Sequence, residues 1–242
     1  VQMGGGLNNI VYSLCVYNSQ LYAGGIFTES NSVPVKYLAK WNGSNWEAVD
    51  NSISSFVRTM AVFNNELIIG GFFTSINSNP ILRVAKYNGT TFSALGNGFN
   101  NTVNVLKVFD GELFAGGSFI SSGSSQIASI AKWNGTEWTA IGNGLTGQVY
   151  DIYKLSNTIY AGGSISSSGI INILNFAFWN GSQWQQCGSG FSSAVRTIEK
   201  IEGKITVGGD FTTSGALQLR RIAVQDTMSL TWNSIGAGFN LI

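Results

Sequence analysis

The sequence predicts an all-β fold, a five-bladed β-propeller built from five four-stranded repeats of 46 residues. Gly-Gly pairs recur at that constant step, at 24–25, 70–71, 116–117, 162–163 and 208–209. A second marker keeps the same step, because Ala-Lys-Trp-Asn-Gly or a close variant begins at 39, 85, 131 and 177. The segments between them are rich in Val, Ile, Phe, Tyr, Trp and Thr, which favour strands. A period of this length is typical of propeller blades.

The repeat boundaries follow from these markers and define a single predicted domain over residues 1–242. The repeats run about 4–49, 50–95, 96–141, 142–187 and 188–235. Residues 236–242 repeat the junction that residues 4–10 already supply, so they are an overlap or closure segment. We expect the blades to close into a ring, since closure removes exposed sheet edges. A fragment of a larger ring is the alternative.

Repeat three illustrates the four strands of one blade, here named A to D. It predicts strands over about 103–109, 112–119, 129–133 and 137–141, with a long loop over 120–128. Asp110-Gly111 and Asn134-Gly135 fall between strands. We expect both to form two-residue type I′ turns, which need positive φ at both central residues. In repeat five the marker at Ala223 is lost and Trp232 comes two residues late, so its last hairpin is the least well specified.

The Gly-Gly pair ends strand B, where we expect neighbouring blades to crowd together and leave no room for a side chain. A phosphate-binding loop would need a following helix and Lys, and the sequence predicts neither. The aromatic residues of strands C and D are expected to fill the wider space between blades. The pair is therefore interpreted as a packing feature.

A family resemblance rests on these residues. Gly-Gly after strand B, an aromatic residue in strand C and a Trp in strand D resemble the kelch-type propeller repeat. The fuller pattern, Tyr-Ala-Gly-Gly-x-Phe followed by Ile-Ala-Lys-Trp-Asn-Gly, is similar to the Gly-Gly-x-Phe propeller repeats of secreted and cell-surface proteins. The resemblance covers essentially the whole chain and implies an extracellular or cell-surface location with a role in attachment and binding.

Composition excludes several classes of function. The chain carries 13 Lys and Arg against 12 Asp and Glu, so its net charge of +1 does not predict a nucleic-acid-binding surface. It contains no His, which excludes His-based catalytic triads and His-ligated metals. Cys15 and Cys187 fall on an inner and an outer strand of non-adjacent blades, so we expect no disulfide. No apolar window is long enough to predict membrane insertion, and no metal or cofactor is expected.

The first candidate ligand site takes one residue from each repeat. Strand A is normally the innermost strand of a propeller blade, and it starts on the face that carries the variable B–C loops. Its second residues are Tyr12, Arg58, Asn104, Tyr150 and Arg196. These side chains offer stacking and hydrogen bonds to a polar ligand at the mouth of a central channel. The alternative is that they line a channel filled with water.

The second candidate site is formed by the strand C aromatics, which could stack on sugars as similar residues do in propeller lectins. They are Trp41, Tyr87, Trp133 and Trp179. Packing between blades is the alternative and the favoured one. Four of the five glycosylation sequons, at Asn42, Asn88, Asn134 and Asn180, coincide with the expected C–D turns, and turn chemistry alone explains them; the fifth is at Asn100.

The sequence therefore favours a non-catalytic extracellular binding module, glycan-binding in the manner of a lectin or adhesive, whose partner is a glycan or a surface protein. The alternative is a structural or protein-docking propeller within a larger surface assembly of further domains or copies. A glycosidase is the third hypothesis, with Asp151 and Asp210 as the two carboxylates that such an enzyme needs. Glu199 is a weaker candidate, because it aligns with Cys15 and Lys107 in other repeats.

Overall fold

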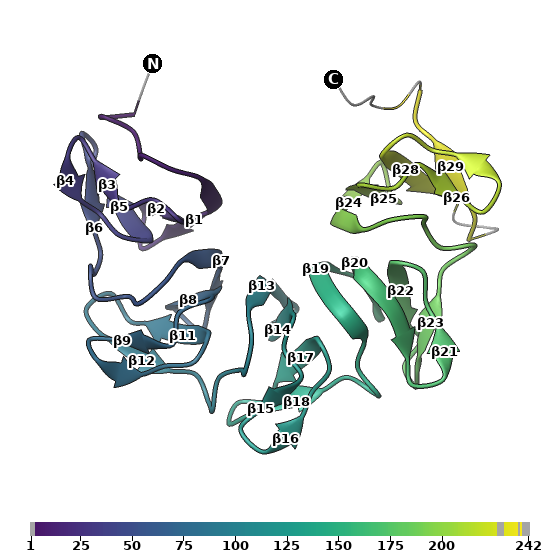
Figure 1. The fold of residues 1–242 in the computed structure, drawn as a ribbon, viewed down its shortest axis with the longest axis horizontal. Coiled ribbons are helices and arrows are strands. Elements are labelled where there is room, and N and C mark those ends of the chain that lie inside the picture. Colours follow the sequence, from purple (N-terminus) through teal and green to yellow (C-terminus); the bar gives the residue numbers. More distant parts are fainter. Residues whose placement is uncertain (1–2, 227–229, 237, 239–242) are drawn as a thin grey trace. The chain divides into compact units, whose positions relative to one another are not determined.

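The structure, a computed structural model, describes residues 3–226, 230–236 and 238. In this part of the chain the regular structure consists of β-strands, without a helix. Each predicted repeat forms one antiparallel sheet of four strands in the order A-B-C-D, and repeat four adds one short strand (Figure 1). The all-β prediction is confirmed, and one sheet per repeat fits five blades. The closure segment 236–242 lies mostly outside the described residues.

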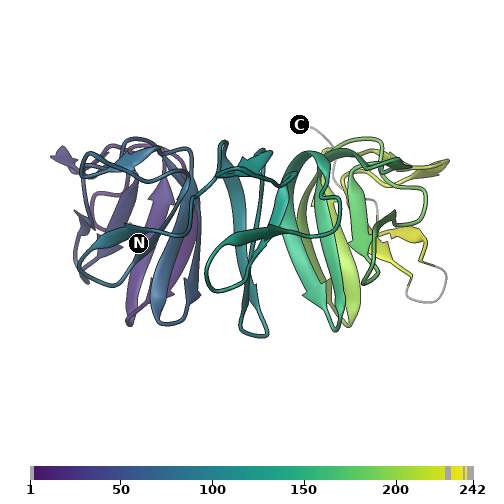
Figure 2. The ribbon, with the colours of Figure 1, turned by 90° about the horizontal axis from the view of Figure 1, so that it is seen from below.

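The long strands of the five blades fall where the repeats place them, and Figure 2 shows them side-on. Strand A is β1 (Val11–Tyr17), β7 (Val57–Phe63), β13 (Val103–Phe109), β19 (Thr146–Leu155) and β24 (Val195–Ile201). Strand B is β2 (Gln20–Gly25), β8 (Glu66–Gly71), β14 (Glu112–Gly117), β20 (Thr158–Ser168) and β25 (Lys204–Gly209). Strand C is β5 (Leu38–Trp41), β11 (Val84–Tyr87), β17 (Ile130–Trp133), β22 (Phe176–Trp179) and β28 (Ile222–Gln225). Strand D is β6 (Trp46–Ala48), β12 (Phe92–Ala94), β18 (Trp138–Ala140), β23 (Trp184–Gln186) and β29 (Trp232–Ser234).

The chain divides into two compact units, each of which is described by itself. Unit 1 comprises Val1–Ala115, Phe119–Ser125 and Lys132–Thr139, and unit 2 comprises Gly116–Ser118, Gln126–Ala131 and Ala140–Ile242. Blades one and two thus belong to unit 1, blades four and five to unit 2, and blade three contributes residues to both. A single domain closed into a ring of five blades stays a prediction.

The core of each unit lies between successive blades and is built from aromatic and branched side chains. Trp138 and Trp184 of strand D are fully buried and donate their indole N–H groups to the backbone of the preceding blade. The acceptors are the carbonyls of Leu95, at 3.1 Å, and Ile141, at 2.9 Å. The expectation that the strand D aromatics fill the space between blades is confirmed.

The two glycines of each pair have different neighbours. A Cβ on Gly70 would lie 2.7 Å from Val103 Cγ1 of the next blade, and a Cβ on Gly162 would lie 2.6 Å from Val195 Cγ1. A Cβ on the second glycine, Gly71, would instead overlap the carbonyl oxygen of Phe56, directly before strand A of its own blade. The absence of a side chain at the first glycine therefore allows the next blade to pack closely, as predicted. The absence of a side chain at the second glycine allows close approach of the backbone before strand A of the same blade.

Strand A carries a β-bulge opposite this glycine pair. In blade one Val11 pairs with Gly25 and Ser13 pairs with Gly24, which leaves Tyr12 unpaired between them. The same register shift leaves Arg58, Tyr150 and Arg196 unpaired in blades two, four and five. A bulge redirects the side chain of its extra residue away from the regular alternation of the strand. Four of the five residues predicted for the channel mouth are therefore bulge residues.

The turns differ from one another in a way the sequence analysis does not anticipate. Asp110 and Gly111 have φ values of 51° and 76°, as a type I′ turn requires. In the C–D hairpin only Gly135 has positive φ, and Trp41 pairs with Trp46 in the equivalent hairpin of blade one, leaving four residues in the loop. The prediction of a two-residue type I′ turn at Asn134-Gly135 is wrong, because the Asn134 carboxamide oxygen accepts two backbone N–H groups and organises a longer loop.

The B–C segments also hold more order than the predicted loops. Short ladders form in them, each with a tight turn: β3 (Glu29–Ser30) with β4 (Val33–Pro34), β9 (Ser75–Ile76) with β10 (Asn79–Pro80), β15 (Ser121–Ser122) with β16 (Ser125–Gln126), and β26 (Thr213–Ser214) with β27 (Leu217–Gln218). In blade four, β21 (Ile171–Asn172) pairs with the long β20. The last hairpin of blade five forms as well, with Gln225 opposite Trp232, although residues 227–229 between its strands are not described.

Candidate functional site

The bulge residues of unit 1 lie in contact across blades one and two. The guanidinium carbon of Arg58 lies 5.1 Å from the centre of the Tyr12 ring, a cation–π arrangement. Tyr12 is 39% exposed, so the pair faces solvent. The structure thus brings together two of the five residues predicted for the channel mouth.

Unit 2 repeats this pair across blades four and five, with one addition. The guanidinium carbon of Arg196 lies 4.4 Å from the centre of the Tyr150 ring. Asp210, which follows the second glycine of blade five, accepts hydrogen bonds from Arg196 Nε at 2.9 Å and from a terminal nitrogen at 2.6 Å. The hydrogen bonds that Arg196 donates to Asp210 raise the pKa of its guanidinium, although partial desolvation opposes the shift. Asn104 holds the same repeat position in blade three and is partly exposed.

Three further residues extend the unit 1 pair, and the sequence analysis missed them. The ring centres of Phe56 and Tyr12 lie 5.9 Å apart. The rings of Phe72 and Phe56 are stacked, with their centres 5.6 Å apart and an interplanar angle of 14°. Arg83 places its guanidinium carbon 4.1 Å from the centre of the Phe72 ring. These residues flank the strands at their loop-rich end. The signal that could have found them is the aromatic residue directly after Gly-Gly, where no other repeat has one.

The strand C aromatics are partly exposed in three of the four cases. Trp41, Trp133 and Trp179 each lie against the strand D Trp of the same hairpin, while Tyr87 is buried. Trp133 and Trp138, for example, have ring centres 5.4 Å apart at an angle of 61°. The three Trp residues thus both pack within the blade and leave part of the indole accessible.

A cleft of about 400 Å³ in unit 1 gives one of these residues a distinct setting. It lies between blade two and the C–D hairpin of blade three, and Trp133 forms part of its wall together with Gly96. A Cβ on Gly96 would approach the Trp133 ring to 2.8 Å, so this glycine keeps the indole accessible from the blade two side. Small-molecule sites in proteins have volumes in this range.

Polar groups from two strands, a turn and a loop line the same cleft. Glu66 on β8 and Lys86 on β11 form an ion pair with a separation of 3.2 Å, and both are partly exposed. Asn64 lies in the turn between β7 and β8, and Thr136 lies in the loop between β17 and β18. The cleft therefore combines an aromatic wall with a carboxylate, an ammonium, an amide and a hydroxyl group.

The carboxylates considered for glycoside hydrolysis have other partners. Asp151 is only 7% exposed, and its carboxylate accepts hydrogen bonds from the backbone N–H of Ile152 at 2.9 Å and of Ile198 at 2.8 Å. Its side chain thereby links strand A of blade four to strand A of blade five. Asp210 is ion-paired with Arg196, and Glu199 is exposed on β24. Both Asp side chains considered for catalysis thus have partners within the protein.

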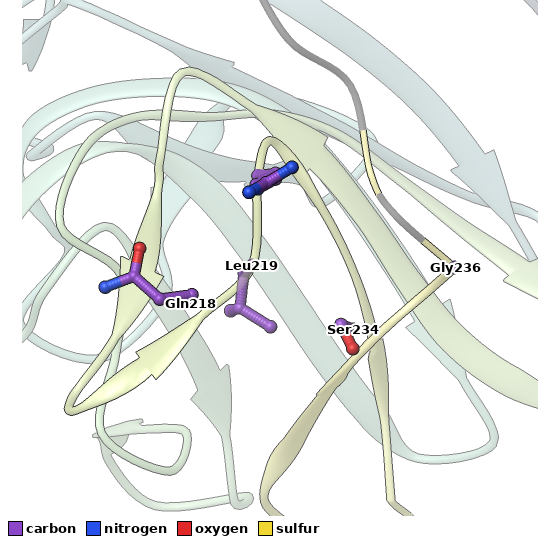
Figure 3. Close-up of a pocket in the computed structure, with 5 residues that line it drawn as sticks. Gln218, Leu219, Ser234 and Gly236 are labelled. Atoms are coloured by element: carbon purple, nitrogen blue, oxygen red, sulfur yellow. The ribbon is translucent and has the colours of Figure 1, made fainter.

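A second hollow, of about 300 Å³, lies in blade five. Gln218, Leu219, Arg220, Ser234 and Gly236 line it, and Figure 3 shows the first two beside Ser234 and the Gly236 backbone. The described residues of its lining include no aromatic side chain.

The two cysteines differ in burial, since Cys15 is half-buried and Cys187 is buried. Cys15 and Cys187 are free thiols, and burial raises the pKa of Cys187 to about 12, despite a hydrogen bond from Gln225 that acts in the opposite direction. A nucleophilic thiol needs a lowered pKa. No group of three metal-ligating side chains occurs among the described residues. Nor does the described part of the chain contain a helix of sufficient length and apolarity to span a membrane.

Comparison with known proteins bears on the fold. A family model described as the Rax2 C-terminal beta propeller domain matches residues 2–158. No curated protein sequence matches the chain.

Solved structures with a similar backbone include three of diverse origin, all below 15% identity. The extracellular domain described as that of a hybrid two-component system, BT4673 from B. thetaiotaomicron, has a TM-score of 0.61 at 13% identity over 94% of this chain and 27% of its own. The WD40 beta propeller domain of Doa1 has a TM-score of 0.56 at 12% identity, over 94% of this chain and 68% of its own. The computationally designed Ika8 protein has a TM-score of 0.56 at 11% identity, over 95% of this chain and 74% of its own. These likenesses show the fold alone, and the predicted β-propeller is confirmed; the narrower kelch-type assignment stays a prediction.

Proposed function

Because the chain belongs to the family of the Rax2 C-terminal beta propeller domain, we propose that it is a non-catalytic, extracellular binding domain that holds a glycan in the cleft beside Trp133. The cleft itself carries the proposal, since it joins an accessible indole to hydrogen-bonding groups on two blades. An extracellular location is supported by the resemblance to propeller repeats of surface proteins. The BT4673 structure, which is described as an extracellular domain, is consistent with this location.

The chemistry of the cleft suits a sugar. A pyranose presents an apolar C–H face, which packs on an indole, and a rim of hydroxyl groups that need hydrogen-bond partners. Glu66 accepts such bonds, Lys86 donates them, and Asn64 does both. Because Glu66 and Lys86 already neutralise one another at 3.2 Å, the cleft favours an uncharged sugar over an anionic one.

The partners of the carboxylates support binding without hydrolysis. A glycosidase needs two carboxyl groups on either side of the scissile bond, free to donate or accept a proton or to attack the sugar. Asp151 is bonded to two backbone N–H groups, and Asp210 is paired with Arg196.

A glycan array of the purified chain, followed by calorimetric titration of the sugars that bind, tests the proposal. Thr136→Tyr should reduce affinity at least about tenfold, because a ring at the cleft mouth excludes the ligand. The residue is exposed, so the fold should be unaffected. Thr90→Tyr is the matched control, since Thr90 holds the same position in the C–D loop of blade two and is not among the residues that line this cleft.

Trp133→Leu gives a second readout, with Trp41→Leu as its control. Trp41 and Trp133 make nearly the same contact with the strand D Trp, with ring centres 5.3 Å and 5.4 Å apart. The two variants should therefore lose similar stability, while only the first loses glycan binding. Absence of binding to every glycan on the array, or an equal loss of affinity in the variant and its control, would contradict the proposal.

A further inference from the structure

A continuous surface of three aromatic rings and two guanidinium groups lies at the loop-rich end of blades one and two, away from the cleft residues of the β7–β8 turn. The aromatic–arginine patch consists of Tyr12, Phe56, Arg58, Phe72 and Arg83. Its members contact one another in series, from Arg58 on Tyr12 through the ring pairs to Arg83 on Phe72, with separations of 4.1 to 5.9 Å. All five belong to unit 1.

The patch is exposed where a folded chain normally hides such groups. Phe72 is 42% exposed and Tyr12 is 39% exposed, and Ile10 and Val11, which precede Tyr12, are exposed as well. Contiguous exposed apolar surface of this kind marks interaction sites in soluble proteins. Aromatic and Arg side chains are also the residues that contribute most binding energy at protein–protein interfaces.

The two guanidinium groups lack a carboxylate partner within the described part of the chain. Ion pairs of the described residues include Lys86 with Glu66, Lys132 with Glu112 and Arg196 with Asp210, and none of these involves Arg58 or Arg83. Arg83 instead donates a hydrogen bond to the carbonyl of Phe72. Burial lowers the pKa of the Arg83 guanidinium, the direction expected for a cation without a neighbouring anion. The patch therefore presents positive charge together with aromatic surface.

We propose that the aromatic–arginine patch is a docking site for an acidic segment of a partner protein. Carboxylates of the segment pair with Arg58 and Arg83 at the two ends, and an apolar side chain packs on the rings between them. An extended chain places every second side chain on the same face, about 7 Å apart, so alternate residues of one segment can present carboxylates and an apolar side chain to the same surface. Charge-assisted, bidentate pairing is the interaction that Arg forms most readily with carboxylates.

The test uses the full chain and a rhodamine-labelled peptide in which two Glu residues flank a Phe at every second position. Fluorescence anisotropy at low ionic strength should show saturable binding that weakens as salt is added. Replacement of both Glu residues of the peptide by Gln should weaken binding at least about tenfold. Absence of saturable binding at low salt overturns the proposal.

Variants locate the site. Arg58→Gln and Arg83→Gln should each weaken peptide binding about tenfold, whereas Arg196→Gln should change it less than about twofold, because Arg196 is already paired with Asp210. Thermal unfolding checks that each variant folds, and Arg58→Gln alone suffices if Arg83→Gln does not. An equal effect of Arg196→Gln overturns the assignment. Tighter, Arg58-dependent binding of a sulfated hexasaccharide, tested in the same assay, would also overturn it in favour of a polyanion site.

Discussion

The two Tyr–Arg pairs both lie on β-bulges but differ in one neighbouring residue. Tyr12 with Arg58 and Tyr150 with Arg196 all sit on strand A bulges of adjacent blades. The residue after the glycine pair decides what else surrounds the guanidinium. In blade five it is Asp210, which neutralises Arg196, and in blade two it is Phe72, which adds an aromatic ring.

Repeats with the same backbone thus acquire different surfaces. The backbone of the blade is fixed by glycines, hairpins and buried aromatics at constant spacing. A single position after Gly-Gly then sets whether the bulge Arg remains available to an external anion. Unit 1 therefore offers an open cationic and aromatic surface, whereas the corresponding Arg of unit 2 is occupied.

The largest expected effect concerns the junction that supports the unit 2 pair. Asp151→Ala should lower the free energy of unfolding by about 3 kcal/mol, because it removes the acceptor of two backbone N–H groups, those of Ile152 and Ile198. Urea unfolding followed by Trp fluorescence measures the change. Ser13, which follows Tyr12, is the residue equivalent to Asp151 in blade one and serves as the control. Ser13→Ala should change the free energy of unfolding by less than about 0.5 kcal/mol. Equal losses at the two positions would show that Asp151 has no special role in joining blades.

Substitution of the residue after the glycine pair should change where the acidic peptide binds. Phe72→Asp should weaken binding of the acidic peptide about tenfold, since it places a carboxylate beside Arg58 and Arg83 and removes a ring. Asp210→Ala should do the reverse in unit 2 and add a weak second site, because it releases Arg196. Calorimetric stoichiometry distinguishes one site from two. If the Phe72→Asp variant bound the acidic peptide with unchanged affinity, residue 72 would not determine binding at the patch.

The smallest expected effect is the coupling within each Tyr–Arg pair. Double-mutant cycles with Tyr→Leu and Arg→Gln should give a coupling of about 0.5–1 kcal/mol, the range for exposed cation–π contacts. The Tyr150–Arg196 pair should be the stronger, because its separation is 4.4 Å against 5.1 Å for Tyr12–Arg58. Thermal and urea unfolding of the single and double variants supply the values. A stronger coupling at Tyr12 would reverse the order that the distances imply.

The repeat made much of the fold predictable. Glycine pairs and Asp-Gly turns depend on local conformation, so their spacing located strand A of blade three at 103–109, where β13 lies. Asn134-Gly135 was predicted incorrectly because the same dipeptide also suits a four-residue loop, in which the Asn side chain caps the backbone. The choice between these turns depends on residues beyond the dipeptide.

The candidate sites were less accessible to sequence reasoning. The spacing of the strand C aromatics identifies Trp133 as a candidate. Lys86, by contrast, resembles an ordinary solvent-exposed residue in the sequence, and only the structure shows its ion pair with Glu66. Phe56 and Phe72 lie just outside strands and gain meaning only when two blades meet. Bulges are hard to locate in a sequence here, because in β1, β7 and β24 only one strand residue precedes the extra one, and the resulting shift in alternation is too short to recognise.

The bulge has a practical consequence for protein engineering. Its residue lies outside the regular strand pairing, so the flanking residues keep their partners whatever side chain it carries. Codons 12, 58, 150 and 196 can therefore be randomised together while the framework stays constant. A display library built in this way would explore about 10⁵ side-chain combinations, twenty at each of four positions, on one scaffold. In this respect the bulge positions are the propeller's counterpart of the hypervariable loops of antibodies.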